Sequence, residues 1–270
     1  MLKRTIVGLI LVPVLLIVTL WAPEIIAAVF LSFFSAVSVN ELLYNTKLVR
    51  HPRMVLYTMI MAFLVPLWCY FGCSYPAALF GSLVFFGLLF GELMIAHTRI
   101  PFYKAVLCMF SGVLIPYFFA SLLRILLMEQ GRYFIMLPFV VAFLSDIGAY
   151  FAGVTLGKHK LCPIISPKKT VEGLIGGILL AVVGALVYGS ILRFGFQFKV
   201  NFGCMLIYGF VGSLGGVFGD LCFSVIKRQT GIKDYGYLIP GHGGILDRFD
   251  SVIVVAPLIE ALLLLVPLVS

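Results

Sequence analysis

Residues 224–250 read SVIKRQTGIKDYGYLIPGHGGILDRFD and lie between two strongly apolar runs of the chain. Within this segment four basic residues stand beside three aspartates, and the glycine-rich sequence GHGG occupies residues 241–244. Glycines let a backbone approach a ligand closely, and carboxylates beside basic groups suit a site for a metal ion and phosphates. The segment therefore predicts a polar binding site set among apolar helices.

The rest of the chain has the composition of a membrane protein. Its 270 residues are 62% hydrophobic and 11% charged, with a mean hydropathy of +1.16, whereas roughly 25% of residues are charged in an average soluble chain. A helix needs about 20 apolar residues to cross a bilayer, so the apolar runs predict an all-α, polytopic bundle of about nine transmembrane helices. These runs are residues 5–21, 25–42, 54–71, 75–95, 104–128, 133–156, 173–192, 202–226 and 251–269.

The distribution of basic residues orients this bundle. The net charge is +8, and most Lys and Arg residues fall on one side of the membrane if the N-terminus is cytoplasmic. This placement favours a cytoplasmic N-terminus, an outside C-terminus and anionic ligands rather than nucleic acid. The first run has the layout of a signal peptide but no small-residue cleavage site, so we expect it to remain as a span.

The two long polar loops, residues 157–172 and 227–250, then both face the cytoplasm. Both lie in the C-terminal part of the chain, and we find no internal repeat and no linker. We therefore predict an N-terminal helical scaffold at residues 1–132 and a C-terminal catalytic half at residues 133–270.

We consider four acidic residues inside predicted spans, where an ionisable group is costly and often marks function. Glu92 is near a cytoplasmic end and can reach the membrane interface, and Glu260 fits a protonated acid hydrogen-bonded to a neighbouring helix. Asp146 and Asp220 differ, because the small residues around both permit close approach of helices. Asp220 lies about 10 Å along a helix from Lys227, so its carboxylate is expected to face a polar cavity beside the loop.

Asp247 and Asp250 are spaced i, i+3 and share a helix face if the last span begins early. Together with Asp220 they would supply hard oxygen ligands, which hold Mg²⁺ and leave positions for phosphate oxygens and water. The alternative is a set of ion pairs with the basic residues of the same loop.

Residues 166–173 read SPKKTVEG and form a second candidate anion site. Ser166 suits a helix N-cap and Pro167 the first helical position, which would place Lys168 and Lys169 at a helix N-terminus. Lysines there oppose the helix macrodipole unless an anion lies between them, and a phosphate would serve. The alternative is that both lysines anchor the protein on the cytoplasmic side of the membrane.

The segment at residues 224–250 resembles the signature of the phosphatidate cytidylyltransferases, also called CDP-diacylglycerol synthases. The shared features are KR at 227–228, KD at 233–234, HGG at 242–244 and DRFD at 247–250, with one additional residue between Gly236 and Pro240. Residues 145–153 (SDIGAYFAG) and 166–173 also resemble stretches of this family. The likeness is specific in the C-terminal half and extends to the N-terminal half through length and span count.

This resemblance implies transfer of CMP from CTP to phosphatidic acid, which yields CDP-diacylglycerol and pyrophosphate in phospholipid biosynthesis and uses Mg²⁺. It implies metal ligation by Asp220 and Asp247, with Asp146 and Asp250 in or around the same site, and it allows a second, monovalent cation. Because the lipid phosphate is already an anionic nucleophile, lysines and metal ions would act by positioning and electrostatic stabilisation.

The expected catalytic residues are Asp220, Asp247, Lys169, Lys227 and Arg248. The expected substrate-binding residues are Ser166, Lys168, Lys169, Ser224, Lys227, Arg228, Lys233, His242, Gly243, Gly244 and Arg248. The metal ligands are expected among Asp220, Asp247, Asp250 and Asp146. His242 is open to two interpretations, as a donor to phosphate or as a turn residue held by backbone contacts.

Other functions remain as alternatives. A CTP-dependent lipid kinase or an isoprenoid-lipid cytidylyltransferase would use a similar site. An ion-coupled transporter would explain the intramembrane acids, but such proteins usually carry structural repeats and broken helices in both halves. We expect an enzyme of the bacterial inner membrane with its active site facing the cytoplasm, and the sequence leaves a homodimer open.

Overall fold

The computed structural model describes residues 17–238 and 243–268 of the chain. The chain divides into two compact units: residues 1–129 with 229–248, and residues 130–228 with 249–270. Most of the polar segment, residues 224–250, therefore belongs with the N-terminal helices, although residues 130–228 of the second unit precede it in sequence.

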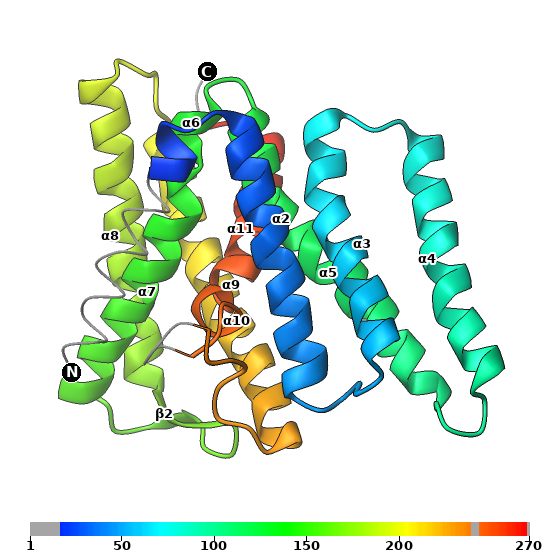
Figure 1. Ribbon diagram of the computed structural model, residues 1–270. Coiled ribbons are helices and arrows are strands. Elements are labelled where there is room, and N and C mark those ends of the chain that lie inside the picture. Colours follow the sequence, from blue (N-terminus) through cyan, green and yellow to red (C-terminus); the bar gives the residue numbers. More distant parts are fainter. Residues whose placement is uncertain (1–16, 239–242, 269–270) are drawn as a thin grey trace. The chain divides into compact units, whose positions relative to one another are not determined.

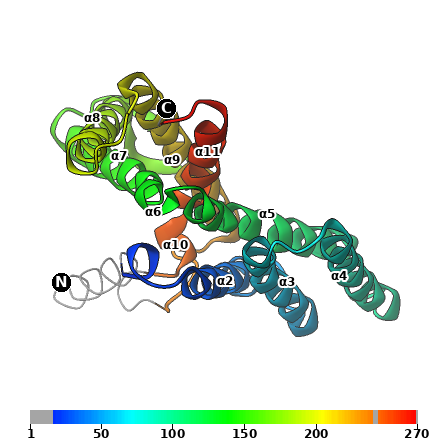
Figure 2. The same ribbon diagram turned by 90° about the horizontal axis from the view of Figure 1, so that it is seen from above.

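The first unit is a helical bundle. Its elements are α2 (Glu24–Asn40), the π-helical turn η1 (Glu41–Asn45), α3 (Pro52–Phe71), α4 (Tyr75–Ile95) and α5 (Phe102–Leu127). Helix α3 packs against both α2 and α5, and it lies between α2 and α4 (Figures 1 and 2). Buried apolar side chains such as Leu31, Met54 and Phe119 form the core. Pro52 begins α3, and Gly72 ends it in the left-handed conformation with φ +58, as these residue types favour.

Helix α4 shows why this bundle needs a membrane. Its large side chains Phe80, Leu83 and Phe86 are exposed. In water such a surface would be unfavourable, but lipid tails are as apolar as leucine, so these side chains suit a bilayer.

The second unit is held together by close helix contacts. Its elements are α6 (Gly131–Phe134), α7 (Met136–Thr155), β1 (Lys160–Cys162), β2 (Ser166–Thr170), α8 (Val171–Gly195), α9 (Phe202–Thr230) and α11 (Val252–Leu265). In the short α10 (Leu246–Phe249), the first three residues belong to the first unit and Phe249 to the second. Helices α7 and α8 lie side by side (Figure 1). A Cβ atom on Gly148 of α7 would lie 2.5 Å from the carbonyl oxygen of Gly176 on α8, so the small residues permit this approach, as the sequence predicts.

The prediction of a polytopic helical membrane bundle is confirmed. Among the described residues, seven helices are long and apolar enough to cross a membrane, and α11 is a shorter apolar helix. These eight correspond to predicted runs two to nine. The first predicted span, 5–21, lies mostly outside the described residues. The cytoplasmic placement of the N-terminus stays a prediction.

The predicted helix start at Ser166 is wrong. Residues Ser166–Thr170 form strand β2, which pairs antiparallel with β1, and Lys160 lies opposite Thr170. Helix α8 begins at Val171, directly after this strand. The Thr170 side chain caps the helix by accepting a hydrogen bond from the Gly173 N–H. This start leaves the two lysines outside the helix and puts Glu172 in the first turn, where a negative charge is favourable.

Candidate functional site

A cavity of about 210 Å³ in the second unit brings together side chains that are far apart in the sequence. Asp146 and Tyr150 line it from α7, Lys168 and Lys169 from β2, and Asp220 from α9. The lining thus combines two carboxylates with two lysines, and four of the predicted site residues meet there.

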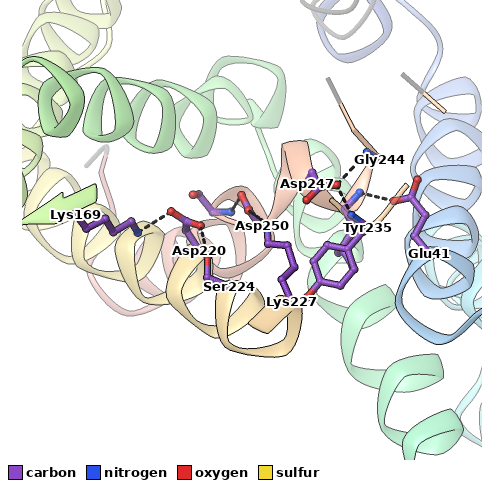
Figure 3. A network of polar contacts seen from close by, with 11 residues as sticks. Glu41, Lys169, Asp220, Ser224, Lys227, Tyr235, Gly244, Asp247 and Asp250 are labelled. Carbon is purple, nitrogen blue, oxygen red and sulfur yellow. Dashed lines mark hydrogen bonds and ion pairs between the residues drawn. The ribbon is translucent and has the colours of Figure 1, made fainter. Parts of the chain in front are cut away.

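Lys169 and Asp220 form an ion pair at this cavity. The Lys169 Nζ atom lies 2.6 Å from Asp220 Oδ2, and the Ser224 hydroxyl donates to Asp220 Oδ1 at 3.1 Å (Figure 3). Successive side chains of a strand point to opposite faces, which explains why Lys169 is turned toward Asp220 while its neighbour Lys168 is exposed. Both partners of the pair keep about a quarter of their side chains exposed, at 24% and 28%, so a ligand can reach them.

Asp250 is a more deeply buried acid of the same unit. Its Oδ1 atom accepts the N–H of Ser251 at 2.9 Å, and its Oδ2 atom lies 3.9 Å from Lys227 Nζ (Figure 3). Burial raises the pKa of Asp250 to about 7, repulsion from Asp220 adds to the rise, and Lys227 opposes it. The carboxyl of Asp146 in turn is repelled by the charge of Asp220 and attracted by that of Lys169.

These three aspartates have the donor chemistry that Mg²⁺ prefers. Asp146, Asp220 and Asp250 are carboxylates that repel one another, and a divalent cation would offset that repulsion. Among the described residues, no three acidic, histidine or cysteine side chains are already gathered closely enough to hold an ion. A bound ion would therefore require side-chain rearrangement, for which the partly exposed Lys169–Asp220 pair is suited.

Asp247 has a different environment, within the first unit. Its Oδ2 atom accepts the N–H of Tyr235 at 2.7 Å and the N–H of Gly244 at 3.0 Å (Figure 3). A carboxylate offers about four lone-pair positions, so these bonds orient the group and are compatible with metal ligation. Because Asp220 belongs to the other unit, shared ligation of one ion by Asp220 and Asp247 stays a prediction. The predicted common helix face of Asp247 and Asp250 is not formed by one helix, since α10 ends at Phe249 and α11 begins at Val252.

The other predicted basic residues are distributed over both units. The Arg228 Nε atom donates to the carbonyl of Ile165 at 3.0 Å, which ties the end of α9 to the β-hairpin. Lys233 and Arg248 are exposed in the first unit. Ser166 is half-buried in β2, and the predicted site residue His242 lies outside the described residues.

The structure also identifies an acid that the sequence interpretation missed. Glu41 is buried, and its carboxylate accepts the backbone N–H groups of Ile245 and Leu246 (Figure 3). The available signal was an ionisable residue at the end of an apolar run. Glu92, by contrast, accepts from the Tyr57 hydroxyl at 3.2 Å and lies 3.7 Å from Arg53, in agreement with its predicted place at a helix end.

Fold and site together define a class: a polytopic helical membrane protein with a cavity lined by carboxylates and lysines and suited to anionic substrates. The family follows from comparison with known sequences. The model of the Cytidylyltransferase family matches residues 2–266, so the chain belongs to this family.

Three bacterial relatives carry the same name, phosphatidate cytidylyltransferase. The protein of Staphylococcus haemolyticus is 39% identical over 181 residues, which are 66% of this chain and 66% of the relative. The protein of Staphylococcus saprophyticus is 38% identical over 177 residues, and that of Staphylococcus epidermidis 39% over 175 residues. The chain thus matches just under two thirds of the length of each relative.

Proposed function

We propose that the chain transfers CMP from CTP to phosphatidate and releases pyrophosphate. A phosphate oxygen of the lipid attacks the α-phosphorus of CTP and forms a new phosphoanhydride bond. The bond from that phosphorus to the oxygen bridging to the β-phosphate breaks, and pyrophosphate leaves with the electron pair. The observation that carries this proposal is the cavity in which Lys168 and Lys169 adjoin Asp146 and Asp220, in a chain of the Cytidylyltransferase family.

The lysines would bind and orient the phosphates. Lys169 can pass from Asp220 to a phosphate oxygen, because its flexible side chain already lies at the cavity and is partly exposed. Lys168, on the exposed face of β2, would meet the outer part of the triphosphate. No general base is needed, since the attacking lipid phosphate is ionised, and catalysis would depend on positioning and charge stabilisation.

Asp146, Asp220 and Asp250 would hold Mg²⁺ in the second unit, and the family resemblance adds Asp247. When bound, the ion supplies positive charge that offsets charge building up on the transferring and departing phosphates. We further propose that the site faces the cytoplasm, which the positive-inside distribution supports, and that phosphatidate enters from that leaflet with its acyl chains among the helices.

The decisive experiment uses purified full-length protein with phosphatidate, Mg²⁺ and CTP labelled either at the α- or at the γ-phosphate. We expect α-label in CDP-diacylglycerol and γ-label in pyrophosphate. Transfer of γ-label to lipid would instead identify a kinase. Uptake of unmodified substrate into vesicles, without labelled lipid, would identify a transporter and overturn the proposal.

A further inference from the structure

Glu41 of the first unit has its partners about two hundred residues further along the chain. Only 2% of the residue is exposed. The N–H of Ile245 donates to Glu41 Oε1 at 3.1 Å, and the N–H of Leu246 donates to Glu41 Oε2 at 2.9 Å (Figure 3). Both carboxylate oxygens are thus bonded to the backbone at the start of α10, directly before Asp247.

Two glycines of the polar segment make room for this carboxylate. A Cβ atom on Gly236 would collide with Glu41 Oε1, and one on Gly244 would collide with Glu41 Oε2. A real side chain at either position would displace the carboxylate from its N–H donors. Gly236 and Gly244 are therefore explained by Glu41, a residue outside the segment in which they occur.

Asn45 forms a hydrogen bond to the same segment at a second point. Its Nδ2 atom donates to the carbonyl of Tyr235 at 2.8 Å, and Tyr235 is fully buried. Glu41 and Asn45 are the first and last residues of the π-helical turn η1 that follows α2. Such turns are rare and frequently occur at functional sites.

Asp247, near the C-terminal end of the polar segment, bonds two other residues of the same segment. Through Oδ2 it accepts the N–H groups of Tyr235 and Gly244, so Tyr235 is bonded through its carbonyl to Asn45 and through its N–H to Asp247. The orientation of the Asp247 carboxylate consequently depends on the backbone path that Glu41 and Asn45 fix.

We propose that Glu41 and Asn45 are positioning residues for CMP transfer: they fix the backbone at residues 235–238 and 243–247 and thereby orient Asp247. This inference rests on the proposed function and assigns part of the active-site architecture to the N-terminal helix α2 and its π turn. Neither residue touches the reacting atoms.

Glu41→Gln is the variant that tests this role. Glutamine keeps the shape of the side chain but offers one acceptor oxygen and an NH₂ group that opposes an N–H donor. Glu92→Gln is the matched control, because Glu92 is also a buried glutamate of the first unit but bonds Tyr57 rather than the polar segment.

Steady-state kinetics of the full-length protein, normalised to folded protein and measured well below the unfolding midpoint, separate positioning from fold stability. For Glu41→Gln we expect kcat to fall by about 10- to 100-fold, the range for residues that orient an active-site ligand without touching it, while the KM for phosphatidate stays unchanged. Glu92→Gln keeps the wild-type kcat. A wild-type kcat in folded Glu41→Gln protein, or an equal loss in Glu92→Gln, would overturn the inference.

Amide hydrogen exchange without substrate gives a readout independent of activity. We expect faster exchange at Tyr235 and at residues 244–246 in Glu41→Gln and unchanged exchange there in Glu92→Gln. Unchanged exchange in Glu41→Gln contradicts the positioning role even if kcat falls. If the wild-type protein forms no CDP-diacylglycerol, the proposed function fails, whereas an active wild type with a fully active Glu41→Gln variant removes only this inference.

Discussion

Two pairs of acidic side chains, Glu41 with Asp247 in the first unit and Asp220 with Asp250 in the second, are held in different ways. In the first unit, backbone N–H groups bond the carboxylates of Glu41 and Asp247, whereas in the second unit lysine side chains face those of Asp220 and Asp250. Backbone donors cannot leave without moving the chain, but a lysine can turn to another anion. The contrast suggests that N–H donors hold the carboxylates of Glu41 and Asp247 in fixed orientations, whereas acids paired with lysine exchange partners when substrate binds.

The largest expected effect concerns Asp220. We expect Asp220→Asn to lower the rate of CMP transfer by about 10³-fold. The substitution removes one of the negative charges that would hold Mg²⁺, and with it the positive charge that stabilises the transferring phosphates. The free energy of unfolding should change little, because the substitution also relieves repulsion with Asp146 and Asp250. Initial rates with α-labelled CTP and unfolding in detergent measure the two effects. Near-normal turnover would show that the lysine-paired acids are not catalytic.

A smaller effect is expected from the adjacent lysines of β2. Lys169→Gln should reduce the rate by about 100-fold and Lys168→Gln by less than about 10-fold, because Lys169 is paired with Asp220 while Lys168 is exposed. The two variants differ by one position on one strand, so each controls for general loss of positive charge. Equal losses would mean that pairing with Asp220 does not select the catalytic lysine.

The smallest of the three effects is on stability, in the first unit. Asp247→Asn should lower the free energy of unfolding by about 1–3 kcal/mol, the cost of weakening hydrogen bonds from buried donors to a charged acceptor. Thermal or denaturant unfolding in detergent, side by side with Asp220→Asn, measures the difference. If Asp220→Asn is the less stable of the two, the distinction between acids held by backbone N–H groups and acids paired with lysine is wrong.

The sequence predicted the parts of the site that depend on local pattern. Asp146, Asp220, Lys168 and Lys169 were selected from two short motifs and from the cost of charges inside apolar runs, and the structure places all four around one cavity. The start of α8 was predicted wrongly because Ser166 and Thr170 both suit an N-cap, and only the pairing of β1 with β2 decided between them.

By itself, the sequence determined that the chain is a polytopic helical membrane protein. The length and apolarity of each run are local properties, and they decide whether a helix can span a bilayer. It also determined which segments carry the polar chemistry. Only the tertiary structure decided which hydrogen-bond donor pairs with which buried carboxylate. Glu41 bonds residues 204 and 205 positions away, and no local pattern specifies such a partner. A buried carboxylate must find hydrogen-bond donors, but only the folded chain determines where those donors come from.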